Sequence, residues 1–174
     1  MKCSRIATNV LGLMMLLSTF VACKPQIEEL SFETIAQDDG FYAGRGYGGE
    51  EPTLLVIASP EEADKPGLDV QFPSELTDQL RTLDYTRDFV VLVLQGQKRS
   101  TGYAVTVKRI VRQRNQVTID AEFVEPSPGT RRNPAFTSPY HLVAVSKERQ
   151  WRQEIKFALV VNSETVAETT YFIP

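Results

Sequence analysis

Cysteine and histidine are almost missing from this sequence. The two cysteines are Cys3 and Cys23, so residues 24–174 hold no thiol, and His141 is the sole histidine. That part of the chain therefore offers no disulfide, thiolate zinc site or cysteine nucleophile, and one imidazole is too few for a typical histidine-based zinc site. No calcium-loop or nucleophile-elbow pattern occurs either. We expect no metal, no cofactor and no catalytic residue, and we interpret His141 as a half-buried strand residue.

Long hydrophobic runs are also missing, except for one near the N-terminus. Two basic residues precede an apolar segment, Val10–Ala22, which is too short to span a bilayer comfortably but has the length of a secretory signal. The segment ends in the small residue Ala22, and Cys23 follows it. A small residue directly before a cysteine resembles the lipobox of bacterial lipoproteins. Ordinary cleavage after this segment fits less well, because bulky Phe20 would stand at the minus-three position. We predict a signal peptide over 1–22 and a polar tether over 23–30.

The lipobox resemblance implies that Cys23 becomes the lipid-modified first residue of the mature protein. The expected location is then the cell envelope, outside the cytoplasm, with the membrane contacted through a lipid anchor.

Charge of either sign is modest overall, with formal net charge −3 at pH 7, but the basic residues are concentrated. Between Gln95 and Arg132, eight basic residues stand against three acidic ones. Such a cluster can orient a partner or contact an anionic membrane; more often it is a solvated strand surface that prevents aggregation. An acidic chain with an export signal and no RNA-binding signature is a poor nucleic-acid binder, so we expect no nucleic-acid partner.

Alternation of apolar and polar residues predicts most of the strands. Residues 103–108 and 117–123 indicate an antiparallel hairpin with one solvated face, and Asn115 in its turn is best suited to a positive φ. The unbroken apolar runs 54–57 and 89–94 are typical of strands buried on both faces, and we expect the second to be central. Further strands are predicted near 30–35 and at 141–145, 155–161 and 165–173.

Two short helices are expected. Ser59-Pro60-Glu61-Glu62 has a serine, a proline and an acid at the positions typical of a helix start, and Lys65-Pro66-Gly67 ends that helix within about two turns. Residues 74–83 place three leucines on one helix face. The predicted fold class is α+β, mainly β: an antiparallel sandwich-like or partly closed sheet with two short helices. It forms a single domain over 31–174 that includes a C-terminal hairpin, 155–173.

The order of turn residues between Gly96 and Val145 carries a family resemblance. Gly96 is followed by Thr101-Gly102-Tyr103, by the turn Glu125-Pro126-Ser127-Pro128-Gly129, and by Thr137-Ser138-Pro139-Tyr140 before a valine-rich strand. This series resembles the C-terminal domain of the protease complex subunit PrcB, most specifically over residues 88–147. The resemblance implies a non-catalytic lipoprotein that supports assembly and stability of an extracytoplasmic protease complex. Its expected partner is therefore a protein, an exported protease.

The turns that carry the resemblance are the candidate interaction surface. Its residues are Gly96, Thr101, Gly102, Tyr103, Pro126, Pro128, Gly129, Pro139 and Tyr140. An aromatic, glycine-rich segment over residues 41–49 is a further contact candidate. It does not fit a phosphate-binding loop, because two adjacent carboxylates and a strand follow it where such a loop needs a helix.

Two alternatives remain open from the sequence. One is a lipoprotein that binds a small ligand or an envelope polymer through tyrosines, which requires a deep apolar pocket. Its candidate residues are Tyr42, Tyr47, Tyr103 and Tyr140. The other, less favoured, is a hydrolase, which requires His141 to lie within hydrogen-bond reach of a serine and a carboxylate.

Overall fold

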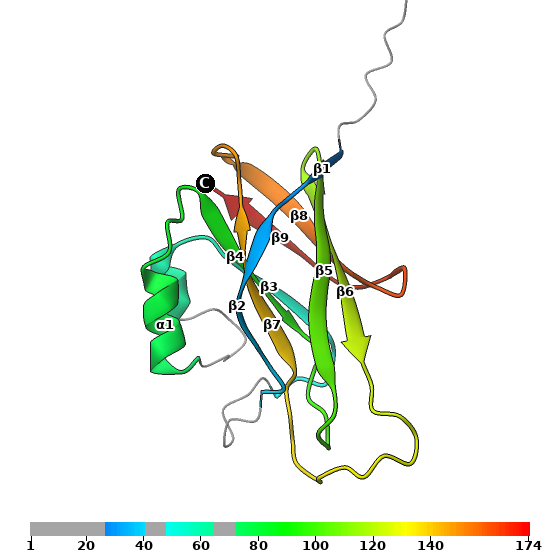
Figure 1. The fold of residues 1–174 in the computed structure, drawn as a ribbon. Helices are drawn as coiled ribbons and strands as arrows, with labels where there is room; N and C mark the ends of the chain where they lie inside the picture. Colours follow the sequence, from blue (N-terminus) through cyan, green and yellow to red (C-terminus); the bar gives the residue numbers. More distant parts are fainter. Residues whose placement is uncertain (1–26, 41–47, 65–71) are drawn as a thin grey trace, which may run out of the picture.

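The computed structural model describes residues 27–40, 48–64 and 72–174 (Figure 1). The predicted signal peptide, the predicted lipid anchor at Cys23, and Tyr42 and Tyr47 lie outside these residues. Within the three described ranges, no helix is both long enough and apolar enough to cross a membrane.

The described strands form two separate sheets. One contains β1 (Ile27–Glu29), β5 (Ala104–Gln113), β6 (Gln116–Val124), β8 (Gln153–Val161) and β9 (Glu164–Ile173), in the order β1-β5-β6-β8-β9. The other contains β2 (Phe32–Asp38), β3 (Thr53–Ile57), β4 (Asp88–Leu94) and β7 (Tyr140–Ser146), in the order β2-β7-β4-β3. A 3₁₀ helix, η1 (Pro60–Asp64), and an α-helix, α1 (Ser74–Arg81), complete the described elements.

The main core lies between the two sheets. Phe89 of β4 is fully buried there, together with Ile119 of β6 and Phe157 of β8. The Phe89 ring centroid lies 5.8 Å from that of Phe157 and 5.3 Å from that of Trp151. Each such aromatic pair contributes about 0.5–1.5 kcal/mol beyond the burial of its area. The mainly β, sandwich-like prediction is confirmed at this level.

A second, smaller core lies on the other face of the four-stranded sheet. There η1 and α1 cover β4 (Figure 1), with Val90 and Leu92 packed against Ala63, Leu76 and Leu80. This third layer explains why β4 has no polar position between its ends, because both of its faces are covered. The predictions of a central strand at 89–94 and of a helix beginning at residue 74 are confirmed.

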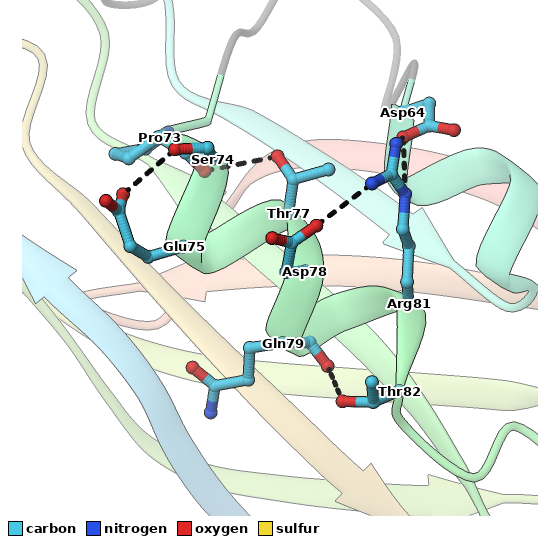
Figure 2. A network of polar contacts seen from close by, with 9 residues as sticks. All are labelled: Asp64, Pro73, Ser74, Glu75, Thr77, Asp78, Gln79, Arg81 and Thr82. Atoms are coloured by element: carbon cyan, nitrogen blue, oxygen red, sulfur yellow. Dashed lines mark hydrogen bonds and ion pairs between the residues drawn. The ribbon is translucent and has the colours of Figure 1, made fainter.

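Polar contacts join α1 to η1 on the outer surface (Figure 2). Arg81 Nη2 lies 2.6 Å from Asp64 Oδ1, and Arg81 Nη1 lies 2.9 Å from Asp78 Oδ1. The hydrogen bond to Asp64 raises the pKa of Arg81, and the charge of Asp64 adds to the effect. Thr77 donates a hydrogen bond to the carbonyl of Pro73 within the first turn.

The helix expected after Ser59 is a short 3₁₀ helix and not an α-helix. Pro66 and Gly67 follow so soon that there is room for little more than one turn. Glu62 reaches back past Ser59, the predicted N-cap: its Oε2 accepts a hydrogen bond from the Ala58 N–H at 2.8 Å, one residue before the N–H that a capping box uses. Its Oε1 accepts one from the Tyr171 hydroxyl of β9, so this carboxylate links η1 to the five-stranded sheet.

Residues 27–30, which we predicted as part of the tether, pack with the domain. Ile27–Glu29 pairs with β5, and Leu30 is buried, with its N–H bonded to the Ile110 carbonyl at 2.9 Å. The polar character of this stretch misled the prediction. Glu29 faces the basic strand β5, where Arg109 Nε lies 3.2 Å from its Oε2.

One strand pairing departs from the predicted antiparallel arrangement. β6 and β8 run parallel, with Ile119 opposite Leu159, because the chain crosses to the other sheet as β7 between them. Alternation reveals which face of a strand is buried but not the direction of its neighbour. The predicted terminal hairpin is confirmed as β8 and β9, and it extends the five-stranded sheet at its β6 side.

The hairpin turns use backbone conformations that the sequence only partly reveals. At the β5–β6 turn the positive φ belongs to Arg114, at 58°, and not to Asn115 as predicted. A single positive φ at the first central residue is typical of a type II′ turn. At the β8–β9 turn both central residues, Asn162 and Ser163, have positive φ (52° and 67°), as in a type I′ turn.

Candidate functional site

The β4–β5 and β6–β7 loops meet at one end of the sandwich (Figure 1), and we call residues 95–103 and 125–139 the loop end. Lys98 and Thr137 form an isolated antiparallel bridge with N–O distances of 2.8 and 2.9 Å. The Thr101 N–H donates to the Asn133 carbonyl at 3.2 Å, and the Asn133 N–H donates to the Thr101 hydroxyl at 3.3 Å. Two loops that the sequence separates are thus joined into one surface.

Gly96 is held where no other residue fits. Its φ is +85°, and a Cβ at this position would lie 2.2 Å from the carbonyl oxygen of Glu50. The next residue, Gln97, donates its N–H to the Gly49 carbonyl at 2.7 Å. The described part of the glycine-rich segment therefore packs against the loop end, and the role of Gly96 is to permit that approach.

The predicted Pro-Gly turn is present at the tip of the β6–β7 loop. The Thr130 N–H bonds to the Ser127 carbonyl at 3.2 Å, and Gly129 has a φ of +83°. Proline followed by a glycine of positive φ is the pattern of a type II turn. Arg132 Nη2 donates to the carbonyls of Pro126 and Ser127, both at 3.3 Å, and so braces the turn from one side. Pro128 and Gly129 are left exposed.

The other predicted site residues do not share one surface. Pro139 is buried, and its carbonyl accepts the Gln95 N–H at 3.0 Å, which extends the sheet beyond β4. Gly102 is exposed, and Pro126 packs so close to it that a Cβ on Gly102 would lie 3.0 Å from the proline Cβ. Tyr103 is half-buried with Lys98 Nζ 5.6 Å above its ring centroid.

Tyr140 lies on the opposite side of the four-stranded sheet from the main core. It packs against the smaller core and lines a hollow of about 350 Å³ with Leu76 and Gln79 of α1. Tyr103 does not line that hollow. Of the four tyrosines proposed as a ligand pocket, the two that the structure describes therefore face different spaces.

His141 points into the space between the two sheets. Its Nδ1 accepts a hydrogen bond from the Val107 backbone N–H at 2.8 Å, and its Nε2 lies 2.9 Å from the Thr34 hydroxyl. Because an N–H can only donate, Nδ1 must carry the lone pair, and Nε2 of the neutral ring then carries the proton and donates to Thr34. Burial lowers the pKa of His141, which favours this neutral form.

This hydrogen-bond arrangement removes the basic nitrogen that the hydrolase alternative requires. The one lone pair of the neutral imidazole is used by Val107, so His141 is not available to take a proton from a hydroxyl. Among the described residues, no group of three or more histidine, cysteine, aspartate and glutamate side chains is placed to hold a metal ion.

Seven of the eight residues of the predicted basic cluster fall into two groups; the eighth, Arg114, lies in the β5–β6 turn. Along the sheet, cations face carboxylates: Lys108 Nζ lies 2.6 Å from Glu122, and Arg112 Nη1 lies 3.9 Å from Glu28. At the loop end, by contrast, four cations form no ion pair with any described carboxylate. They are Lys98, Arg99, Arg131 and Arg132.

Sequence reasoning missed one residue of the loop end. Phe136 is 66% exposed, the largest exposed fraction among the described large hydrophobic residues. It precedes Thr137, the bridge partner of Lys98, so it stands directly beside the joined loops. The available signal was an aromatic residue outside any alternating run, in a loop that contains four prolines.

Comparison with known proteins bears on the same region. Residues 89–146 match the family model described as PrcB C-terminal. The predicted resemblance, placed over 88–147, is confirmed. The PrcB-like segment spans β4 to β7 and contains both loops of the loop end as well as His141. No curated protein and no solved structure matches the chain.

Proposed function

We propose that this chain is a non-catalytic, membrane-anchored interaction subunit that assembles or stabilises an extracytoplasmic protease complex. The PrcB-like match over residues 89–146 supports the link to a protease complex. One observation carries the role of the loop end: the turns that define the resemblance are hydrogen-bonded to each other and leave Phe136 and several cations exposed. Such a preformed surface suits contact with another macromolecule.

The state of His141 supports a role without catalysis. A general base needs a free lone pair and a nucleophile beside it, whereas Nδ1 of His141 binds Val107 of the other sheet and Nε2 contacts Thr34 of the neighbouring strand β2. The residue then belongs to the architecture that positions the loop end.

The membrane-anchored part of the proposal rests on the sequence that ends in Cys23. The lipid would follow a short apolar segment, and β1 begins only four residues later. A tether of that length holds the domain close to the membrane surface.

Crosslinking in whole cells tests the proposed function. The full chain, expressed from its own signal in its native host, is crosslinked and recovered with an antibody against the domain. We expect an exported protease in the recovered material, and a shorter half-life of that protease when the chain is deleted. Both should be restored by the wild-type chain and by His141→Asn. Recovery of no exported protein would contradict the proposal, and so would substrate turnover by the purified domain that His141→Asn abolishes.

A further inference from the structure

We propose that the loop end docks an acidic segment of the partner protein, with an apolar side chain or pocket of that partner held against Phe136. This inference rests on the proposed function and adds to it the chemistry of the partner and the surface that it contacts.

The charge of the partner follows from the unpaired cations. Arg99 and Arg131 are exposed and form no ion pair within the described residues. The Lys98 ammonium lies over the Tyr103 ring and likewise forms no ion pair there. The cations of β5 differ, because each of Lys108, Arg109 and Arg112 has a carboxylate within 4 Å. A surface whose cations lack internal partners is electrostatically complementary to carboxylates supplied from outside.

The apolar part of the contact follows from the position of Phe136. The antiparallel bridge between Lys98 and Thr137 makes Arg99 and Phe136 the next residues along the two joined segments. The exposed ring is therefore flanked by positive charge. An exposed aromatic residue beside an arginine is a combination enriched in protein interfaces.

The position of the loop end indicates a protein partner and not the anionic membrane surface. β1, which follows the predicted anchor, pairs with the far end of β5, where Ile27 lies opposite Gln113. The loop end begins at the other end of β5, beyond Ala104 (Figure 1). At about 3.4 Å per residue, β5 places these two ends about 30 Å apart. A domain tethered through β1 can therefore turn the loop end away from the lipid.

Glu50 and Glu51 also stand near this end, since the segment before β3 packs on Gly96. Neither pairs with the four cations within the described residues. Glu125, the acidic residue of the loop end itself, also forms no ion pair with these cations within the described residues.

Site-specific photocrosslinking tests this inference. The photoreactive amino acid benzoylphenylalanine replaces Phe136 in the full chain in its native host. A matched chain carries it at Phe172, the exposed aromatic of β9, which is 54% exposed. Both positions are exposed, so the substitutions should leave the fold intact, and the melting temperature of each purified domain verifies this. We expect an adduct at position 136 to a protein segment rich in aspartate and glutamate, and little adduct at 172.

Charge reversal then tests the electrostatic part. Arg99→Glu with Arg131→Glu should lower the adduct yield at position 136 by roughly tenfold or more, because charge complementarity governs the rate of association. Arg149→Glu, an exposed arginine in the connector after β7, at the end away from the loops, should leave the yield unchanged. Equal yields at 136 and 172 would overturn the inference. So would an adduct to phospholipid, to a second copy of this chain or to a basic segment, or indifference to the charge reversal.

The two proposals fail in different ways. If crosslinking of the wild-type chain recovers an exported protease but the adduct forms at Phe172, the proposed function stands and the docking surface is wrong. If no exported protein is recovered by either method, the proposed function itself fails.

Discussion

The Nδ1 atom of His141 accepts a hydrogen bond from the backbone N–H of Val107 at 2.8 Å, and this contact joins the two sheets at an open strand edge. β1 pairs only with residues 111–113 of β5, so in the described part of the chain Val105–Val107 has no strand beside it on that side. Gln37 of β2 binds the same open edge: its side-chain amide donates a hydrogen bond to the Val105 carbonyl at 2.6 Å. Side chains of one sheet thus replace a missing strand of the other.

The His141 contact predicts an acid-sensitive stability. Burial lowers the pKa of His141 below its ordinary value of 6.5. The imidazole therefore binds a second proton more tightly in the unfolded chain than in the folded one. The neutral imidazole therefore stabilises the fold above pH 6.5, and the contribution is lost as the pH falls through the lower pKa of the folded state. Urea denaturation between pH 7.5 and 5 should show this loss in the wild-type domain.

The matched variant for that measurement is His141→Asn. Its side-chain oxygen occupies roughly the place of Nδ1 and can accept the Val107 N–H, but it does not titrate. We expect a smaller loss of stability on acidification than in the wild type. An equal pH dependence in both proteins would show that His141 does not cause it.

A Cβ at Gly96 should disturb the loop end. Gly96→Ala combines a positive φ with a contact of 2.2 Å to the Glu50 carbonyl, so we expect the free energy of unfolding to fall by about 2 kcal/mol or more. Gly129→Ala is the control, because its φ of +83° is similar but no heavy atom lies within 4 Å. Its loss should be about 1 kcal/mol, from backbone strain alone. Equal losses in chemical denaturation would mean that the Glu50 approach is unimportant.

Arg112 should not tolerate replacement by lysine. Its guanidinium carbon lies 3.9 Å from the Trp151 ring centroid, and its Nε donates to the Arg114 carbonyl at 3.0 Å. Lysine keeps the charge but loses the planar stacking, so Arg112→Lys should lower the free energy of unfolding by about 1 kcal/mol. The exposed Arg109→Lys serves as the control and should change little. Trp151 is the only tryptophan, so its fluorescence reports both the transition and its altered surroundings.

Cys23→Ser tests the predicted anchor directly. The variant should leave the detergent phase in a detergent-partition experiment on cells of the native host, whereas the wild type should remain in it. Once the signal peptide is removed, the variant carries no acyl chain, and the domain surface carries no predicted anchor. Continued partitioning of the variant would contradict the lipid-anchor prediction.

The sequence predicted the faces of strands better than their partners. Alternation placed Val105, Val107 and Ile119 on the buried side correctly, since burial follows directly from local spacing. The pattern breaks after Val107, where a β-bulge between Val107 and Arg109 moves Ile110 onto the same face. Bulges and parallel pairings depend on contacts between distant segments, which spacing along the chain does not encode.

Site residues whose role depends on backbone conformation were predictable from the sequence. Residues whose role depends on side-chain packing were less predictable. Gly96 and Gly129 were identified because turns and close approaches need glycine, and both have positive φ. Pro139 and Tyr140 belong to the same motif, but the structure uses them to extend β7 and to fill the space beside α1. The exposure of Phe136 depends on how two loops meet, so the linear sequence could only hint at it.

The parallel pairing of β6 with β8 determines where this chain can be truncated without loss of its fold. The PrcB-like stretch ends at residue 146, yet β6 takes its second neighbour, and Phe89 its two aromatic partners, from residues beyond that limit. A fragment restricted to the matched residues would leave one edge of β6 without a hydrogen-bonded neighbour, and it would leave a cavity beside Phe89. The segment that matches the family model is therefore smaller than the segment that folds. Any truncation or chimera should include the final hairpin, β8 and β9.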